Sequence, residues 1–338
     1  MGLSARSRTI TRVIAITAVL IVGAAGLSAQ RGQGRPPAPP PDAPPQGPGR
    51  GGPGGPDGFG GLNVTAANPL TPEKIDAGRK LFFDTRLSAD NSTSCATCHD
   101  PSKAFTDGRA IARGVHDALG SRNTPSLVNA GFGRAFFWDG RATTLEAQVL
   151  GPMTNPNEMG LTESDIQKRT NMKAADVADA LASYVRTIRS RDSRDDYFRA
   201  GQTQMLSVDE RAGLDVFRGR QCVTCHGGPN LTDDRFHNTG IGWANGQFAD
   251  QGRVVVTNDE RDRGAFKTPS LRDVARTAPY MHDGSLATLG DVVAFYSQGG
   301  RRNPNQDPRM RPLNLSRDEQ RALVAFLKAL NGKISDGQ

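Results

Sequence analysis

Cys95-Ala96-Thr97-Cys98-His99 and Cys222-Val223-Thr224-Cys225-His226 are two copies of one five-residue pattern, and they contain all four cysteines of the chain. The pattern C-x-x-C-H is typical of covalent c-type haem attachment. Its two thiols bond to the haem edge, and the following histidine becomes an axial ligand of the iron. We therefore predict two haems. The attachment residues are Cys95, Cys98, Cys222 and Cys225, and the proximal iron ligands are His99 and His226.

Other uses of paired cysteines fit this spacing poorly. The two pairs of a zinc ribbon are usually about 15–20 residues apart, whereas more than a hundred residues separate these. A disulfide framework predicts scattered cysteines, and a thioredoxin-like C-x-x-C does not require the histidine that follows. The sequence therefore favours haem.

The first 29 residues are typical of a cleavable export signal. Arg6, Arg8 and Arg12 precede an apolar run at 13–26, which ends at the small residues 27–29. Because c-type haem is attached outside the cytoplasm, we expect a periplasmic protein with no membrane span after cleavage. An uncleaved N-terminal anchor is the alternative, although the run is shorter than the roughly 20 residues that a span needs.

Residues 30–65 are rich in proline and glycine, which predicts a disordered tether. The rest is long enough for two domains, which we place at residues 66–200 and 201–338. Of the net charge of +7, the signal contributes three charges and the tether one, which leaves +3. Four haem propionates bring the core near neutrality, so no nucleic-acid partner is expected.

An internal repeat relates the two halves at a constant offset of 144 residues. The matching segments are 123–127 and 267–271, 137–140 and 281–284, and 142–145 and 286–289. The same offset pairs Tyr296 with Pro152. A tyrosine phenolate can bind iron and a proline side chain cannot. We therefore predict a six-coordinate second haem and an accessible first haem.

The local signals predict an all-α fold of two cytochrome-c-like helical domains, each binding one covalent haem. Thr71-Pro72 begins a helix, and Ser207 with Glu210 and Ser316 with Glu319 form capping boxes. Val254-Val255-Val256 is the one strand candidate of note, and residues 190–204 are expected to be a charged loop at the domain boundary.

From about Leu70 to Gly332 the chain resembles the dihaem cytochrome c peroxidase family, which includes MauG-like enzymes. The motifs that carry the resemblance are 94–99, 122–127, 137–142, 151–159, 222–226, 236–240 and 278–284. The resemblance implies two helical domains packed face to face with calcium between them. It also implies that the first haem reacts with H2O2 and the second relays electrons from a donor protein.

Carried over by position, the resemblance implies roles for further residues. Trp138 lies between the haems, with its repeat partner His282 nearby, and Gln148 and Glu158 form the distal peroxide pocket. A carboxylate in that pocket can move the proton that O–O cleavage requires. The implied calcium ligands are Asn123, Thr277 and Pro279.

Several assignments remain open at this stage. His116 is either a distal ligand of the first haem or a solvated loop residue, and His237 is expected to make structural or propionate hydrogen bonds. Tyr296 is the expected sixth ligand of the second haem, with Met281 and Met310 as rivals.

The leading hypothesis is a peroxidase that reduces H2O2 with electrons from a small cytochrome c or cupredoxin. The alternatives are a MauG-like enzyme that oxidises a tryptophan or tyrosine of a partner protein, and a dihaem electron carrier. Relatives often dimerise, so a homodimer is among the expected assemblies.

Overall fold

In the computed structural model of the chain, residues 61–337 are described. The predicted signal peptide, and the predicted tether up to residue 60, lie outside the described residues. The α-helices are α1 (Pro72–Phe82), α2 (Cys95–Cys98), α3 (Leu145–Thr154), α4 (Glu163–Thr170), α5 (Ala174–Val185), α6 (Arg194–Arg199), α7 (Val208–Gly219), α8 (Val254–Thr257), α9 (Leu289–Ser297) and α10 (Arg317–Ala329). No helix in this part of the chain is long and apolar enough to cross a membrane.

Side chains that accept hydrogen bonds from the first turn begin the main helices. The backbone N–H of Lys74 donates to Thr71 Oγ1 at 3.4 Å, and Pro72 occupies the first turn of α1. The predicted capping boxes at the start of α7 and α10 are present. The helical prediction is confirmed at these positions because caps depend only on neighbouring residues.

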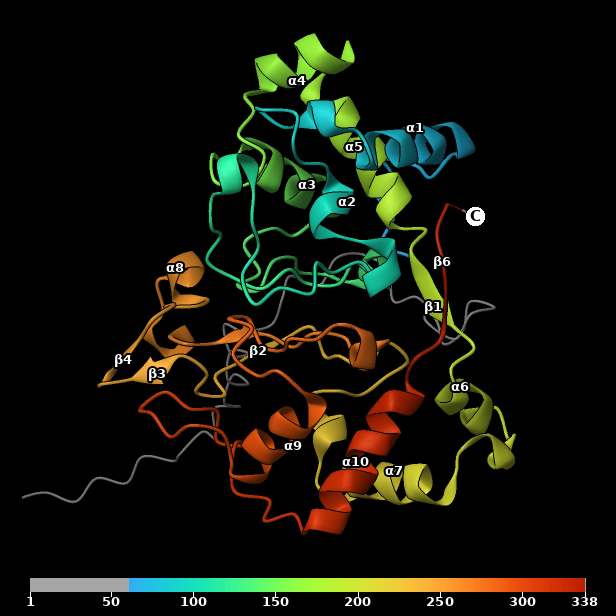
Figure 1. Ribbon diagram of the computed structural model, residues 1–338, viewed down its shortest axis with the longest axis vertical. Helices are drawn as coiled ribbons and strands as arrows, with labels where there is room; N and C mark the ends of the chain where they lie inside the picture. The colour runs from blue at the N-terminus through green and yellow to red at the C-terminus, as the bar shows by residue number, and fades with distance from the viewer. Residues whose placement is uncertain (1–60, 338) are drawn as a thin grey trace, which may run out of the picture. The chain divides into compact units, whose positions relative to one another are not determined.

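Two hydrophobic clusters form, one in each half of the sequence. In the first, α5 packs on α1 and α3; in the second, α10 packs on α7 and α9. Equivalent glycines permit the closest approaches. A Cβ on Gly78 of α1 would lie 1.9 Å from the carbonyl oxygen of Ala180, and one on Gly213 of α7 would lie 2.0 Å from that of Ala322. Figure 1 shows the two groups of helices on opposite sides of the loops that carry the site.

Six short strands form three antiparallel pairs in the described residues: β1 (Arg189–Arg191) with β6 (Lys333–Ser335), β2 (Phe236–His237) with β5 (Phe266–Lys267), and β3 (Trp243–Ala244) with β4 (Gln247–Phe248). In the first pair, Ser190 lies opposite Ile334, so the end of the chain returns to the end of the first half.

Three local predictions are wrong. The predicted disordered tether does not extend to residue 65, because the Asn63 N–H donates to the Gly131 carbonyl oxygen at 2.8 Å and Arg186 Nε donates to the Asn63 carbonyl oxygen at 2.9 Å. The valine run forms the short helix α8, which ends where the Asn258 N–H donates to the Val254 carbonyl oxygen at 2.8 Å; the left-handed φ of Asn258 (55°) allows this turn. The expected loop at 190–204 contains β1 and α6, and α6 begins with a Ser193–Asp196 capping box. Short-range hydrogen bonds outweigh the β-propensity of valine in α8 and the charge of the segment in α6.

Candidate functional site

One cavity of about 990 Å³ extends between the two C-x-x-C-H motifs. All four cysteines are free of disulfides, and the cavity lining includes Cys95, Cys98, Cys222, Cys225, His99 and His226. Burial raises the pKa of the Cys95 thiol to about 12 and that of the Cys222 thiol to about 11, so both are protonated thiols in the bare chain. The donor set and the shared cavity fit two covalently attached haems.

The two motif histidines are oriented in the same way. His99 Nδ1 lies 3.0 Å from the carbonyl oxygen of Phe105, and His226 Nδ1 lies 3.2 Å from that of Leu231. Both carbonyls belong to residues with left-handed φ, 61° at Phe105 and 52° at Leu231, a conformation uncommon for bulky side chains. A hydrogen bond at Nδ1 fixes the ring and leaves Nε2 available to a metal.

Burial also keeps these rings in the form that binds metal. It lowers the pKa of His99, and it lowers that of His226 to about 4. Both imidazoles are therefore neutral at neutral pH, as iron ligation requires.

The distal residues expected in the first half line the cavity together. Gln148 and Pro152 lie on α3, and Glu158 follows that helix. Asn155 Nδ2 donates to Glu158 Oε1 at 2.7 Å, which fixes the carboxyl group. Burial raises the pKa of Glu158, although Asn155 and Arg141 act in the opposite direction. A buried carboxyl group with a raised pKa that lines a cavity has the properties that general acid–base chemistry requires.

Tyr296 lines the second half of the same cavity from α9. Burial raises its pKa, and the neighbouring Cys225 and Cys222 act in the same direction, which places its hydroxyl near the second attachment motif. Met281 and Met310 also line the cavity, so both rival ligands have access to it.

Trp138, Asn123 and His282 form a hydrogen-bonded connection between the halves. Trp138 Nε1 donates to the Asn123 carbonyl oxygen at 2.8 Å, and the Asn123 N–H donates to the His282 carbonyl oxygen at 2.7 Å. The Trp138 and His282 rings meet edge to face with centroids 6.4 Å apart. Burial lowers the pKa of His282 to about 4, so this ring is neutral at neutral pH.

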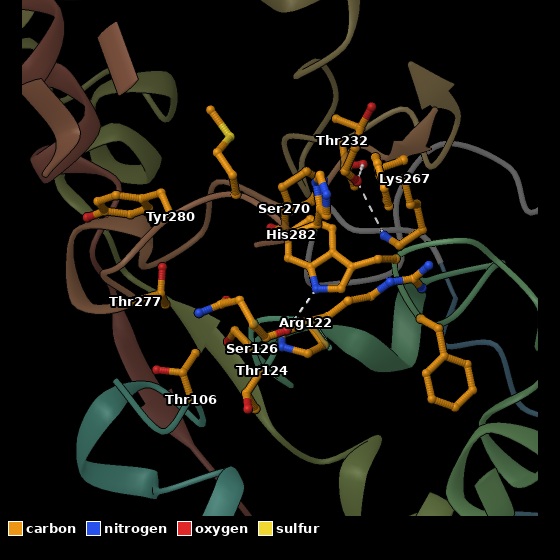
Figure 2. Close-up of a pocket in the computed structure, with 18 of the residues that line it drawn as sticks. Thr106, Arg122, Thr124, Ser126, Thr232, Lys267, Ser270, Thr277, Tyr280 and His282 are labelled. Carbon is orange, nitrogen blue, oxygen red and sulfur yellow. Dashed lines mark hydrogen bonds between the residues drawn. The ribbon is translucent and has the colours of Figure 1, made fainter. Parts of the chain in front are cut away.

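Arg122, which sequence reasoning did not single out, holds the same region together. Its guanidinium pairs with Asp139 at 2.7 Å and with Asp250 at 2.6 Å. It also lies 5.5 Å above the ring of Phe266, which stacks on His282 at 3.5 Å. Figure 2 shows Arg122 beside His282 in the pocket. Asp250 is 128 residues away from Arg122, so no local sequence pattern could have revealed this ion pair.

Comparison with known proteins gives one consistent result. A family model described as di-haem cytochrome c peroxidase matches residues 72–204, and one described as cytochrome c matches 211–331. The methylamine utilization protein MauG of Methylorubrum extorquens is 39% identical over 286 residues, which cover 79% of this chain and 80% of that protein. The chain belongs to the dihaem cytochrome c peroxidase family.

Two further relatives agree. The cytochrome-c peroxidase IdrP2 of Denitromonas iodatirespirans is 35% identical over 305 residues, covering 77% of this chain and 82% of that protein. A crystal structure of a MauG-like protein associated with microbial copper homeostasis superposes with a TM-score of 0.75 at 36% identity, covering 80% of this chain and 92% of that one. Membership identifies the chain as a peroxidase-type enzyme that carries two c-type haems.

The three residues expected to bind calcium all line the cavity. Asn123 Nδ2 donates to the Arg109 carbonyl oxygen at 2.8 Å, which leaves its side-chain oxygen available as a ligand. Thr277 Oγ1 donates to the Val274 carbonyl oxygen at 3.0 Å, so its own carbonyl oxygen is the more suitable ligand atom. Figure 2 shows Thr277 in the same view as Arg122 and Thr124. Their role with calcium stays a prediction.

His116 lies outside the cavity lining. Its side chain is 74% exposed, and its Nδ1 lies 3.3 Å from Asp90 Oδ2. Its backbone N–H also donates to that oxygen at 2.9 Å. Here it is a solvated loop residue, and the ligand alternative requires the loop to move.

His237 makes side-chain hydrogen bonds beside the second motif, at 3.0 Å to Asp233 and 2.7 Å to Asp307. Burial opposes protonation, but these two carboxylates raise the pKa of His237 to about 11. Ligand atoms of Cys225, Asp233 and His237 lie within 4.8 Å of one another. Because Cys225 is an attachment residue, we interpret this group as support for the second haem rather than as a separate metal site.

Proposed function

We propose that this enzyme is a periplasmic cytochrome c peroxidase that catalyses H2O2 + 2 e⁻ + 2 H⁺ → 2 H2O with electrons from a small donor protein. The observation that carries the proposal is the asymmetry of the cavity. Its first half has Gln148 and Glu158 with Pro152 at the position that Tyr296 occupies in the second half. One centre is then accessible to a small oxidant and the other is closed.

Bound haem supplies the redox-active iron. The chain's own residues supply the acid–base chemistry. The ionised carboxylate of Glu158 accepts a proton from peroxide and returns it to the departing oxygen, which contributes about 10²–10⁴-fold to the rate. Asn155 holds that carboxylate in place through its 2.7 Å hydrogen bond, and Gln148 orients peroxide from α3.

Electrons reach the first centre through the contacts between the halves. The Trp138–Asn123–His282 hydrogen bonds provide a continuous route, and the Lys267 N–H donates to the Trp138 carbonyl oxygen at 2.8 Å. We propose that calcium binds at Asn123, Thr277 and Pro279 and fixes the same interface, since a hard cation prefers oxygen ligands.

The donor docks at the exposed side of the second attachment motif. Val223 lies within that motif and is 40% exposed. Arg218 and Arg220 are exposed and precede that motif by a few residues, and Arg311 is exposed and lines the same cavity. Arg220 pairs with Glu319 at 2.7 Å. An apolar centre with a basic rim suits a small acidic cytochrome c or cupredoxin.

A MauG-like oxidation of a partner's tryptophan or tyrosine is the second candidate. Tyr296 favours it, because an anionic oxygen ligand stabilises high oxidation states of iron. The likeness to MauG proteins supports it as well.

Stopped-flow mixing of the dihaem protein with H2O2 tests the proposal. A rapid spectral change, followed by steady turnover with a reduced small cytochrome or cupredoxin, is the expected result. A spectral change without donor turnover would favour the MauG-like alternative. No reaction with peroxide would leave only the electron carrier.

A further inference from the structure

The two related halves differ in charge on the cavity side of their matching loops. The 144-residue offset pairs Arg141 with Ser285 and Gln148 with Val292. Arg141 is 44% exposed and lines the cavity, whereas Ser285 is exposed and does not line it. The first half therefore has a cation where the second half has a small neutral side chain.

Two contacts hold the Arg141 side chain in place. Its guanidinium carbon lies 3.4 Å from the centroid of the Phe137 ring, and Nη1 donates to both Asp139 carboxylate oxygens, at 3.1 and 3.0 Å. Asp139 is 3% exposed and is fixed in turn by Arg122. The cation therefore occupies a defined place rather than moving freely in solvent.

Phe137 is itself pressed against the distal helix. It has a left-handed φ of 64°, which is strained for an aromatic residue. A Cβ on Gly151 of α3 would lie 2.8 Å from the Phe137 ring, so only glycine permits this approach. The Phe137 ring lies between the Arg141 guanidinium and the helix that carries Gln148.

Arg141 and Glu158 line the same cavity. Burial raises the pKa of Glu158, the hydrogen bond from Asn155 lowers it, and the charge of Arg141 lowers it further. Other charged groups face this part of the cavity. Arg113 also lines the cavity, from the loop whose Val115 N–H donates to the Glu158 carbonyl oxygen at 2.8 Å. It is paired with Asp117 at 2.6 Å, as Arg141 is with Asp139 at 3.0 Å, and Cys98 becomes an uncharged thioether on haem attachment. Of these two cations, Arg141 is the one whose charge lowers the pKa of Glu158.

We propose that Arg141 is a third functional residue of the peroxide pocket, whose charge stabilises both the ionised Glu158 carboxylate and an anion at the distal face of the first haem. This inference rests on the proposed function. The proton balance is H2O2 + Glu158-COO⁻ → HOO⁻ + Glu158-COOH, and Arg141 remains protonated throughout. Arg141 acts as a positioning residue, through electrostatics on Glu158 and on the hydroperoxide anion.

The test uses azide, a small anion, titrated spectrophotometrically into the oxidised dihaem protein. We expect Arg141→Gln to raise the azide Kd at the first haem about tenfold or more, as expected for loss of a charge-assisted interaction. Arg141→Lys should restore most of the affinity. Arg134→Gln is the control, because Arg134 is exposed nearby but does not line the cavity. Carbon monoxide, a neutral ligand of the reduced haem, should bind all variants alike.

A second measurement separates an electrostatic role from a structural one. Arg141→Gln should shift the acid limb of the peroxide reaction to higher pH, whereas Arg141→Lys should not. The inference would be overturned if Arg141→Gln bound azide as tightly as the wild type and kept the wild-type acid limb of the peroxide reaction. Equal losses in the Gln and Lys variants would also overturn it, because they would point to packing. A wild-type protein that reacts with neither azide nor peroxide would instead reject the proposed function.

Discussion

Pro152 and Tyr296 occupy the same position in two related helices. Each lies eight residues after the threonine that caps its helix, Thr144 for α3 and Thr288 for α9, and both line the cavity. The repeated position thus presents a side chain with no donor atom to the cavity in the first half and a phenol in the second. This difference within a repeated frame is the basis for expecting the two haems to differ in their sixth ligand.

Replacement of Tyr296 by phenylalanine should change only the second haem. Loss of the phenol oxygen removes the expected sixth ligand, so the low-spin signal of that haem should shift or convert to high spin in electron paramagnetic resonance. The signal of the first haem should stay the same. Tyr280→Phe is the control, because Tyr280 lines the same cavity but donates its hydroxyl hydrogen to the Val274 carbonyl oxygen. An unchanged second-haem signal in Tyr296→Phe would point to Met281 or Met310 instead.

Replacement of Glu158 by glutamine should slow the reaction with peroxide about 10²–10⁴-fold, because the proton acceptor is lost. Burial raises the pKa of Glu158 above its ordinary value. The carboxylate must be ionised to act as a base, so the wild-type rate should fall as pH drops through this raised pKa. Stopped-flow rates across pH measure both effects. The acid limb should disappear in Glu158→Gln and persist in Glu163→Gln, whose side chain is exposed on α4.

Replacement of Trp138 by phenylalanine should uncouple the two centres. The variant loses the hydrogen bond to the Asn123 carbonyl oxygen and the indole ring, while most of the packing remains. Peroxide should still react at the first haem, but transfer of the second oxidising equivalent to the other haem should slow at least tenfold. Rapid-scan spectroscopy at wavelengths specific to each haem measures this step. The other tryptophan, Trp243, pairs with Phe248 in the β3–β4 hairpin, so Trp243→Phe should transfer at the wild-type rate.

The sequence predicts those parts of the molecule that depend on neighbouring residues. Sequence patterns a few residues long identify the attachment motifs and the helix caps. The 144-residue repeat identifies Pro152 and Tyr296 as equivalent positions. The Arg122–Asp250 ion pair and the Lys267–Trp138 hydrogen bond join residues more than a hundred positions apart, and no periodic pattern marks them. The valine run at 254–256 misleads because its β-propensity acts only when a partner strand is present.

Replacement of Glu146 by glutamine should destabilise the first half. Glu146 pairs at 2.8 Å with Arg186, whose side chain is 1% exposed, so the variant leaves a buried cation without its counter-charge. We expect a loss of about 3 kcal/mol in the free energy of unfolding at pH 7. Asp318→Asn, which breaks an exposed pair with Arg321, should change little.

The contribution of the Glu146–Arg186 pair to the free energy of unfolding depends on pH, and its direction follows from the pKa of Glu146. Burial raises the pKa of Glu146, but the hydrogen bonds from Arg186 and Asn68 outweigh burial and lower it below the ordinary value. The contribution is therefore complete above the unfolded pKa near 4.5 and is lost as pH falls through the lower folded pKa. Urea unfolding followed by circular dichroism at several pH values should show a gap between wild type and Glu146→Gln that narrows in acid. A gap that stays constant would mean that the destabilisation comes from packing alone.

Reversal of charge at the basic rim should weaken turnover with an acidic donor. Arg311 is exposed and lines the cavity, and Val223 is an exposed apolar side chain within the second attachment motif. Arg311→Glu should lower kcat/KM for an acidic donor about tenfold at low salt, and the difference should shrink as ionic strength rises because salt screens exposed charges. The peroxide reaction of the isolated enzyme should be unaffected. Arg317→Glu, on the exposed start of α10, is the matched control. An equal loss in both variants would indicate that net charge, rather than this surface, determines donor binding.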